Sequence, residues 1–555
     1  MSSDFGAILL DGELRDREAS KAPGRPERLQ GFDVFLEGFS RALFTRSQHG
    51  PVLLPREALL ASRGTMPRWF PDVQAKVRSV AAGDPRALDA WERLLLLSIG
   101  PEMLQYAWMR EDAGRPDWPI TAILHSPQPI PRIRYLFTNH LLGTLGRHDA
   151  LVCPSHAARK VIEASFRAVP RALRSTDDLP MELPVIPMGV DSADWQATSR
   201  EEARRALALP ATGPIVLWFG RLSPSDKGEM LPFLRALAPT LEQHNARLVM
   251  AGDDSSHHLA GTLRELAEEL GYGERFAVFP DVTRAMKQTL FQAADIFLGL
   301  ACTMHEGFSL TIAEAMASGL PIIASDWAGH REWVEDGVSG YLIPTYLPSG
   351  SGHSVITLYA GAAQENYWEL STVTDLAVLQ QTVDALLGDS QMRARMGEAA
   401  QRFARETFDW DVVMRSYDTL WQEQFARAAH LRRHSPVRPQ VSLPAIFTSY
   451  PTRSMRATDV LGIPQGAPGD DFLPALADAR YFRQDVFRQI LRAFHDRAGS
   501  GSLTDITSDV LDAFPGALHS SDVERHIGRL LKHGLLEMAR EASSTSPLPL
   551  TVNAN

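Results

Sequence analysis

Short apolar runs alternate with amphipathic stretches in two separate parts of this chain, and this alternation constrains the fold more than any other feature. In the first part the strand candidates are 7–10, 52–54, 119–124 and 150–153, with a helix near 33–45. In the second part the strand candidates are 215–219, 246–251, 276–279, 296–300, 321–325 and 340–343, with helices over 229–244 and 259–270. Parallel strands need long crossover connections, usually helices. The pattern therefore predicts an α/β fold with two Rossmann-like domains and a cleft between them.

Proline-containing segments mark the predicted domain boundaries. A proline-spaced stretch at 179–191 separates a first domain over 1–190 from a second domain over 191–410. Further helices are predicted at 375–387, 391–406 and 412–429. A linker containing proline and arginine then leads to a small, mainly helical module over 436–540, and the spacing of its helices, at 481–494, 503–513 and 521–536, suggests a winged-helix-like unit. The terminal stretch 541–555, rich in serine and proline, is predicted to be disordered.

Composition excludes several classes of protein. At 555 residues the chain is too long for one core. A net charge of −11 argues against sequence-independent nucleic-acid binding, which depends on neutralising phosphates. Cys153 and Cys302 are far apart in apolar runs, which predicts buried thiols and no disulfide framework or metal site. With no secretory signal and no apolar stretch approaching about 20 residues, a cytoplasmic protein is expected. Peripheral membrane contact and the oligomeric state stay open.

Two glutamates, Glu306 and Glu314, lie on either side of a loop-to-helix junction. A buried strand candidate precedes the loop, Gly307 breaks the chain, and a short apolar helix is predicted over 310–318. The first amides of that helix, those of Phe308, Ser309 and Leu310, are expected to be unpaired and to suit a phosphate. Glu314, about one turn inside, can accept hydrogen bonds from a ribose diol. Most helix glutamates are solvated, but an unpaired carboxylate on so apolar a helix needs a partner or a ligand.

A second cluster precedes the first in the sequence. The strand candidate 215–219 is followed by Gly220, which turns the chain, and then by Arg221 and Lys227. Both cations are expected at the carboxyl edge of the sheet, where ligands bind in folds of this type. Together they can bind a diphosphate, arginine through fixed donors and lysine through a point charge. An arginine and a lysine at such a spacing are more often simply solvated. Here the two glutamates that follow in the sequence favour a diphosphate-binding site instead.

With these motifs in view, residues 119–425 resemble the retaining glycosyltransferases of family four, which have the GT-B architecture of two facing Rossmann-like domains. The resemblance implies that Glu314, the second residue of the family's Glu-x7-Glu signature, binds ribose and that Glu306 lies beside the donor sugar. Arg221 and Lys227 match the diphosphate-binding pair of the family. The segment 185–191 resembles the inter-domain connection, with Met188 where asparagine is more usual. The helix after Phe408-Asp-Trp410, over 411–430, resembles the tail that crosses back to the first domain.

The resemblance also assigns a residue to the other side of the cleft. His125, at the end of a strand candidate, matches a histidine close to the transferred sugar, although a histidine at a strand end is by itself more often structural. The chain departs from the family at Ser309, where glycine is usual, and we expect the hydroxyl to cap the helix. It also lacks the usual glycine-rich loop after the first strand, for which Gly12, Gly24 and Gly31 are the candidates.

These features predict an enzyme that transfers a hexose from a nucleotide diphosphate sugar and retains the anomeric configuration. UDP and GDP sugars are the foremost candidates for the donor. No metal and no cofactor are expected. The acceptor, whether a glycan, a lipid-linked sugar, a small molecule or a protein, stays open. A phosphorylase or an epimerase of the same fold is the alternative within the class.

A regulatory or scaffold protein acting through the 436–540 module is the alternative outside the class. The last predicted helix of this module carries Arg525, Arg529 and Lys532, but also Asp522 and Glu524. A protein-contact module is therefore favoured over a reader of DNA.

Overall fold

The computed structural model describes the chain in two compact units, 1–438 and 439–555. The described residues are 6–9, 31–46, 52–55, 77–80, 91–127, 145–168, 179–347, 372–434 and 455–539, without 102, 196–197, 224–226, 229, 302, 305, 478–481, 516 and 519. Several predictions lie outside them: the glycine candidates Gly12 and Gly24, the thiol of Cys302, the linker after 434, most of the long insert after 344, and the tail 541–555. No helix of the described part has the length and apolar character needed to cross a bilayer.

The first unit contains two parallel six-stranded sheets with the same strand order. The first sheet has the order β3-β2-β1-β4-β5-β6, from β1 (Gly6–Leu9), β2 (Val52–Pro55), β3 (Val77–Val80), β4 (Leu94–Ser98), β5 (Ile120–Ile123) and β6 (Ala150–Val152). The second has the order β12-β11-β10-β7-β8-β9, from β7 (Ile215–Phe219), β8 (Arg247–Gly252), β9 (Phe276–Pro280), β10 (Ile296–Gly299), β11 (Ile322–Ser325) and β12 (Gly340–Ile343). Numbered within each domain, both read 3-2-1-4-5-6, the order of a dinucleotide-binding domain.

Helices cover both faces of each sheet, as the alternation predicts. Those of the first domain are α1 (Gly31–Arg46), α4 (Leu104–Asp112) and α6 (His156–Ala168). Those of the second are α7 (Arg200–Ala206), α8 (Met230–Gln243), α9 (Leu259–Glu269), α10 (Arg284–Ala293), α11 (Leu310–Ala317), α12 (His330–Trp333) and α15 (Leu376–Gly388), with the single-turn η5 (Ser192–Trp195) and η6 (Gly273–Arg275). A two-stranded ribbon, β13 (Thr345–Tyr346) and β14 (Val373–Thr374), flanks the insert.

The sequence analysis missed β3 and β4. β4 is central to the first sheet, and all five of its residues are buried. Its leucine run at 94–97 has no alternation, because a central parallel strand is covered on both faces. A short continuous apolar run also fits a buried helix segment, so periodicity alone does not assign it.

The chain crosses between the two domains twice, and the crossings lie side by side. The backbone N–H of Val190 donates to the carbonyl of Phe408 at 2.8 Å, and Val190 forms a parallel bridge with Asp409. Gly189 lies against the ring of Trp410, where a Cβ atom would come within 2.3 Å of a ring carbon. Only glycine permits this approach, because any side chain at 189 would displace the indole.

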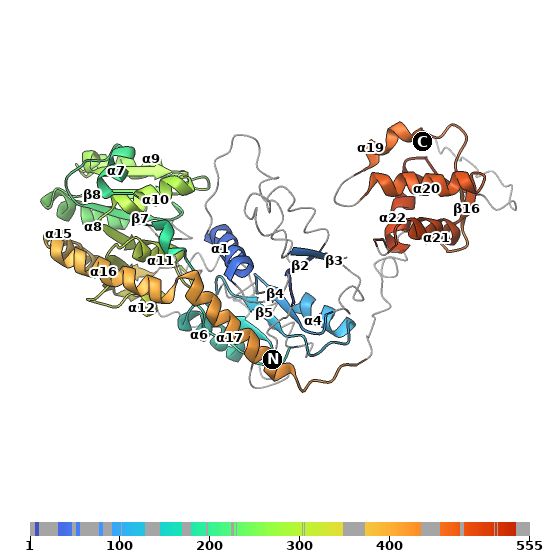
Figure 1. Ribbon diagram of the computed structural model, residues 1–555. Coiled ribbons are helices and arrows are strands. Elements are labelled where there is room, and N and C mark those ends of the chain that lie inside the picture. Colours follow the sequence, from blue (N-terminus) through green and yellow to red (C-terminus); the bar gives the residue numbers. More distant parts are fainter. Residues whose placement is uncertain are drawn as a thin grey trace, which may run out of the picture. The chain divides into compact units, whose positions relative to one another are not determined.

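After the second crossing the chain returns to the first domain. Helices α16 (Ser390–Thr407) and α17 (Trp410–Ala428) follow one another along the edge of the first unit, orange in Figure 1. The amide nitrogen of Gln424, on α17, donates to the carbonyls of Ile120 and His148, each at 2.9 Å, and its oxygen accepts from Thr121 at 2.7 Å. Gln424 is fully buried, so all three bonds are made away from water.

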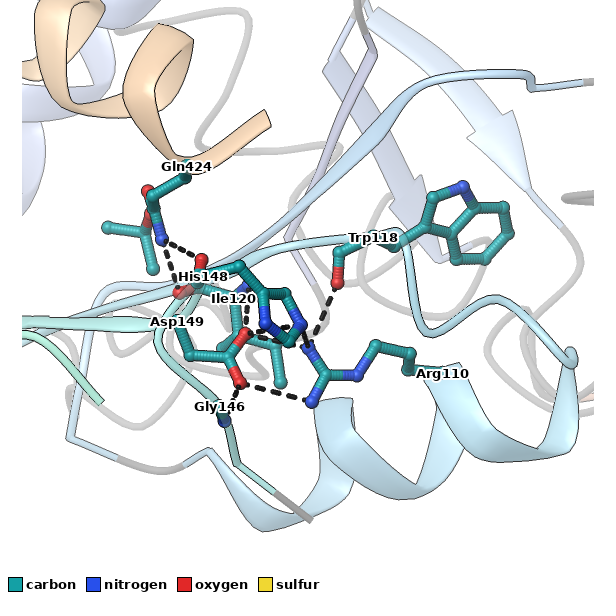
Figure 2. Close-up of polar contacts among 8 residues, drawn as sticks. Arg110, Trp118, Ile120, Gly146, His148, Asp149 and Gln424 are labelled. Carbon is teal, nitrogen blue, oxygen red and sulfur yellow. Dashed lines mark hydrogen bonds and ion pairs between the residues drawn. The ribbon is translucent and has the colours of Figure 1, made fainter. Parts of the chain in front are cut away.

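Beneath Gln424 lies a buried ion pair, shown in Figure 2. Arg110, on α4, donates to both carboxylate oxygens of Asp149, at 2.6 and 3.0 Å, and to the carbonyl of Trp118 at 3.1 Å. Asp149 also accepts from the amides of Ile120 and Gly146, each at 2.9 Å. His148 Nε2 lies 2.8 Å from the guanidinium, so this nitrogen must accept, and burial lowers the pKa of the imidazole accordingly.

The second unit has its own core. Helices α20 (Gln484–Asp496), α21 (Leu503–Ala513) and α22 (Ser520–Lys532) pack with the short α19 (Leu473–Leu476) and the single turn η7 (Asp470–Phe472). The strands β15 (Val460–Gly462), β16 (Ser500–Ser502) and β17 (Glu537–Met538) form an antiparallel sheet in the order β16-β15-β17. The three predicted helices are present, whereas the strands, two or three residues long, were not predicted.

Removing one partner from the buried pair should destabilise the first domain. Arg110→Met leaves the carboxylate of Asp149 buried without its counter-charge, so we expect a loss of about 3–5 kcal/mol. The matched control is Arg427→Met, which removes an exposed pair with Glu423 on α17 and should cost below about 0.5 kcal/mol. Thermal unfolding followed by circular dichroism checks both. Equal midpoints for the two variants would contradict the assignment.

Acid should loosen the second unit through His526. Its Nε2 accepts from the amide of Arg483 at 2.8 Å and its Nδ1–H donates to the carbonyl of Asp522 at 2.7 Å, and burial lowers the pKa of the imidazole below 6.5. Because the unfolded chain binds the proton more tightly, this stability is complete above pH 6.5 and falls as the pH drops below it. Hydrogen exchange of α22 in the full chain, corrected for intrinsic rates, should show protection falling from about pH 7.5 to about pH 5.5. In His526→Gln the protection should change less, and an equal change in both proteins would count against the histidine.

Candidate functional site at the carboxyl ends of the second sheet

The strand order places a ligand crevice beside β7 and β10, because the crossovers diverge between the first and fourth strands of such a sheet. Gly220 follows β7 directly and donates its amide to the carbonyl of Ala251 at 3.0 Å. Gly252, with φ +148°, approaches so closely that a Cβ there would lie 1.7 Å from the Gly220 carbonyl oxygen. The side chain of Lys227 passes over Gly220, whereas Arg221 is exposed at the same edge. Both predicted cations therefore lie at the carboxyl edge of the second sheet.

Glu306 is buried and paired with one of those cations. Lys227 Nζ lies 2.8 Å from Glu306 Oε2. Burial by itself would raise the pKa of Glu306, but Lys227, with a smaller contribution from the Ser309 amide, holds the pKa below its usual range. Burial lowers the pKa of His330, so this histidine is neutral at neutral pH and Lys227 is the main counter-charge. Glu306 is therefore an ionised carboxylate inside the protein.

Ser309 does not cap the helix as expected. It precedes α11 with φ +76°, in the left-handed region, and its side chain makes no capping hydrogen bond. Its Oγ lies 3.3 Å from Thr311 Oγ1 instead. The backbone conformation explains why glycine suits this position. The phosphate contact with the amides of Phe308, Ser309 and Leu310 stays a prediction.

Glu314 lies just beyond the first turn of α11 and is 2% exposed. The partner that its apolar surroundings require is Lys287 of α10, whose Nζ lies 2.6 Å from the carboxylate. The sequence analysis missed Lys287, although its register was a readable signal: it shares the buried face of α10 with Leu290 and Phe291. Burial raises the pKa of Glu314 and the nearby Lys287 opposes that rise.

A pocket of about 60 Å³ opens beside Glu314. Its lining includes Glu37 and Arg41 of α1 from the first domain, Asp191 of the inter-domain crossing, and Arg284 and Lys287 of α10. Arg284 donates to both oxygens of Glu37, each at 2.9 Å, which joins the two domains across this pocket. Glu314 Oε2 is buried and lies 2.6 Å from the Lys287 ammonium, as Oε1 does, although only the contact with Oε1 has hydrogen-bond geometry. Because each carboxylate oxygen has two lone pairs, Glu314 can accept a further hydrogen bond from a hydroxyl in the pocket that it lines.

His125 lies on the facing side, just after β5. Its ring edge contacts Phe35 of α1, with centroids 4.7 Å apart, and its Nε2 donates to the carbonyl of Ile99. A Cβ added to Gly307 would lie 3.4 Å from the carbonyl oxygen of His125. The backbone at His125 therefore meets the residue that follows Glu306, while a catalytic role for the imidazole stays a prediction.

A second set of inter-domain contacts, absent from the sequence analysis, lies at the same junction. Ser155 Oγ donates to the carbonyl of Gly307 at 2.7 Å and accepts from the amide of Ala158, at the start of α6. The carboxylate of Glu332, on α12 of the second domain, accepts from the amides of His156 and Ala157 at 2.7 and 2.6 Å. A carboxylate at a helix start is stabilised by the unpaired amides and the helix dipole. The position of Ser155 between a strand and a helix could have predicted a helix cap. Its hydrogen bond to Gly307 could not have been predicted from the sequence.

Contacts between strand ends of both sheets show that the carboxyl edges face each other, which is the GT-B architecture. The crystal structure of Anabaena Alr3699/HepE in complex with UDP is similar, with a TM-score of 0.50, 18% identity, and coverage of 75% of this chain and 99% of that one. A glycosyltransferase from Rickettsia africae ESF-5 has a TM-score of 0.51, 14% identity, and coverage of 78% and 100%. At these identities the likenesses establish the fold alone.

The second domain also matches known sequences. The family described as Glycosyl transferases group 1 matches residues 213–360. D-inositol 3-phosphate glycosyltransferase of Mycolicibacterium gilvum (strain PYR-GCK) is 33% identical over 213 residues, 38% of this chain and 46% of that protein. The same enzyme of Mycobacterium leprae (strain Br4923) is 36% identical over 166 residues, 30% and 37% of the two chains. The chain spans less than half the length of these relatives. Residues 213–360 therefore carry a group 1 glycosyl transferase domain.

Neutralising Glu332 should weaken the junction between the domains. Glu332→Gln keeps the shape of the side chain but removes the charge that faces two amides of α6, so we expect a loss of about 0.5–2 kcal/mol. The matched control is Glu335→Gln, because Glu335 follows α12 closely in the sequence and its side chain is exposed. Thermal unfolding of the full chain measures both variants, and equal midpoints would show that the contact contributes nothing.

Proposed function

We propose that this chain is a glycosyltransferase that transfers a hexose from a nucleotide diphosphate sugar, bound at the carboxyl ends of β7 and β10. The observation that carries the proposal is the buried carboxylate of Glu314, which is held by Lys287 and lines a pocket one helical turn from the start of α11. A ribose diol can donate to the lone pairs that the ammonium leaves on this carboxylate. The match of residues 213–360 to group 1 glycosyl transferases supports the same interpretation.

The diphosphate is assigned to Arg221, Lys227 and the start of α11. As the bond between sugar and phosphate breaks, negative charge grows on the diphosphate, and fixed cations and amides stabilise it. Lys227 is paired with Glu306, which holds the cation at the site. These groups supply the positive charge that the reaction needs, and we propose a metal-independent transfer on that basis.

Glu306 is placed beside the donor sugar in this proposal. Because Lys227 keeps it ionised, it can accept hydrogen bonds from sugar hydroxyls. Retention is proposed by a front-face path, in which the acceptor hydroxyl attacks on the side of the departing phosphate and the phosphate takes the proton. His125, on the facing domain, is the proposed neighbour of the transferred sugar. Proton NMR of the product tests this path, and an inverted anomeric configuration would exclude it.

The nucleotide is proposed to be UDP, with GDP next. The Anabaena structure with the same fold contains UDP, which supports the order without deciding it. The acceptor is open, and the phosphorylase and epimerase alternatives share the fold. Release of free nucleoside diphosphate only when an acceptor is supplied separates transfer from both.

The second unit is proposed to contact a protein or the acceptor. Two of the three cations expected to face a partner are engaged within the unit: Arg525 pairs with Asp522, and the guanidinium of Arg529 lies 5.3 Å from the ring centre of Phe482. Lys532 is exposed. Engagement of both arginines favours the proposed protein contact over phosphate binding. The winged-helix-like classification stays part of this proposal. The proposed contact is tested by measuring transfer to the native acceptor by a chain without residues 436–555.

Nucleotide binding is the first measurement. At about 100 times its dissociation constant, the correct nucleotide should stabilise the chain by about 2.7 kcal/mol in a thermal-shift screen of UDP, GDP and ADP. Glu314→Gln and Arg221→Met should reduce the shift, because each removes a contact to the ligand, whereas Glu335→Gln should not. If none of the three nucleotides and their sugars moves the unfolding midpoint, the proposal fails.

A further inference from the structure

Lys287 is a buried cation that the proposed reaction does not use. It lies in the first turn of α10, on the face that packs against the second sheet, and is 5% exposed. Its ammonium lies 5.2 Å from the ring centre of Phe219, 5.6 Å from Trp195 and 6.0 Å from Phe291. Aromatic faces stabilise a cation, but a buried lysine still loses most of its hydration. Such a residue needs a reason beyond packing.

The geometry with Glu314 supplies that reason. Lys287 Nζ lies 2.6 Å from Oε1 and equally 2.6 Å from Oε2, but only the contact with Oε1 has hydrogen-bond geometry. Because the ammonium is equally close to both oxygens, it restrains the rotation of the carboxylate, whose remaining lone pairs can accept from a group in the pocket that Glu314 lines. Apolar residues of similar volume often replace buried ion pairs without loss of stability, so stability alone does not require a lysine here.

We propose that Lys287 is a positioning residue that orients Glu314 toward the ribose of the nucleotide and so makes the site select ribonucleotides over deoxyribonucleotides. The inference rests on the proposed function and adds a residue to its donor site. Lys287 acts through Glu314 and is not expected to touch the sugar. Burial tends to protonate Glu314, and a protonated carboxyl would lose part of its capacity to accept, which the lysine opposes.

Other charges face the same pocket. Arg284 comes from α10, Glu37 and Arg41 from α1, Asp191 from the crossing and Asp194 from η5. Arg284 is bound on both nitrogens to Glu37, and Arg41 pairs with Glu37 at 2.9 Å and with Asp191 at 3.5 Å. Of these cations, Lys287 is the one that contacts Glu314. Substitution of Lys287 should therefore change the orientation of Glu314, whereas substitution of Arg284 or Arg41 should not do so directly.

The test combines protein variants with ligand variants. Isothermal titration of the full chain measures dissociation constants for UDP, 2′-deoxy-UDP and 3′-deoxy-UDP, with the matching GDP and ADP sets. The wild-type protein should bind one ribonucleotide about tenfold or more tightly than a deoxy analogue that lacks the contacted hydroxyl, the range for a hydrogen bond to a charged group. Lys287→Met should bind that ribonucleotide about tenfold more weakly and its deoxy analogue within about twofold of wild type. Lys287→Arg, which keeps the charge, should retain most of the preference, and Glu314→Gln should lose it.

The outcomes separate the two proposals. If the wild-type protein binds no nucleotide of the three sets, the proposed function falls. If it binds a ribonucleotide with the expected preference and Lys287→Met keeps that preference, the role of Lys287 is overturned while the proposed function stands. The role of Lys287 is also overturned if the wild-type protein binds the ribonucleotide and its deoxy analogues equally tightly.

Folding of the variants is checked by circular dichroism. Lys287→Gln, which keeps a polar side chain of similar length, replaces the methionine variant if that one fails to fold. A retained preference in Lys287→Gln would be equally decisive against the inference.

Discussion

Contact between the indole of Trp410 and the backbone of Gly189 underlies the arrangement of the first unit. It holds the outgoing and returning crossings together, and the same ring lies 5.9 Å from Phe35 and 6.1 Å from Phe39 of α1. The apolar cluster around it runs from the first sheet through α17 to α10 and α11. One continuous core therefore serves both domains near the crossings, where their carboxyl edges meet.

Several residues of the candidate site come from segments that follow strand ends and meet across this junction. β7 and β10 deliver Lys227 and Glu306 from one domain, and the segments after β5 and β6 bring His125 and Ser155 from the other. The charged groups are paired, a partly exposed Lys227 with the buried Glu306, and Lys287 with Glu314, both buried. Pairing lowers the cost of desolvating each charge, so the site can exclude water and still hold both pairs.

Much of the second domain could be predicted from the sequence, because its strands and helices are strongly patterned. The strands of the second sheet lie where periodicity placed them, as does the helix over 503–513 of the second unit. The burial of Glu314 followed from the apolar residues around it, but its partner did not, since no local pattern relates Lys287 to a residue 27 positions away. The same holds for Glu332 and Ser155, whose contacts depend on how two domains dock. The prediction missed β4 for a local reason, as a strand buried on both faces has no alternation to read.

Gly307 has a consequence for how the enzyme tolerates change. A Cβ there would lie 3.2 Å from Pro127 and 3.2 Å from Pro154, two rigid rings of the facing domain. Both distances are shorter than an ordinary van der Waals contact, so one added methyl group would require the proline rings or their backbone to shift by a few tenths of an ångström. The absence of a side chain at Gly307 therefore lets the two domains approach until backbone meets proline. This contact sets the distance between the domains here and fixes where the preceding residue, Glu306, lies between them.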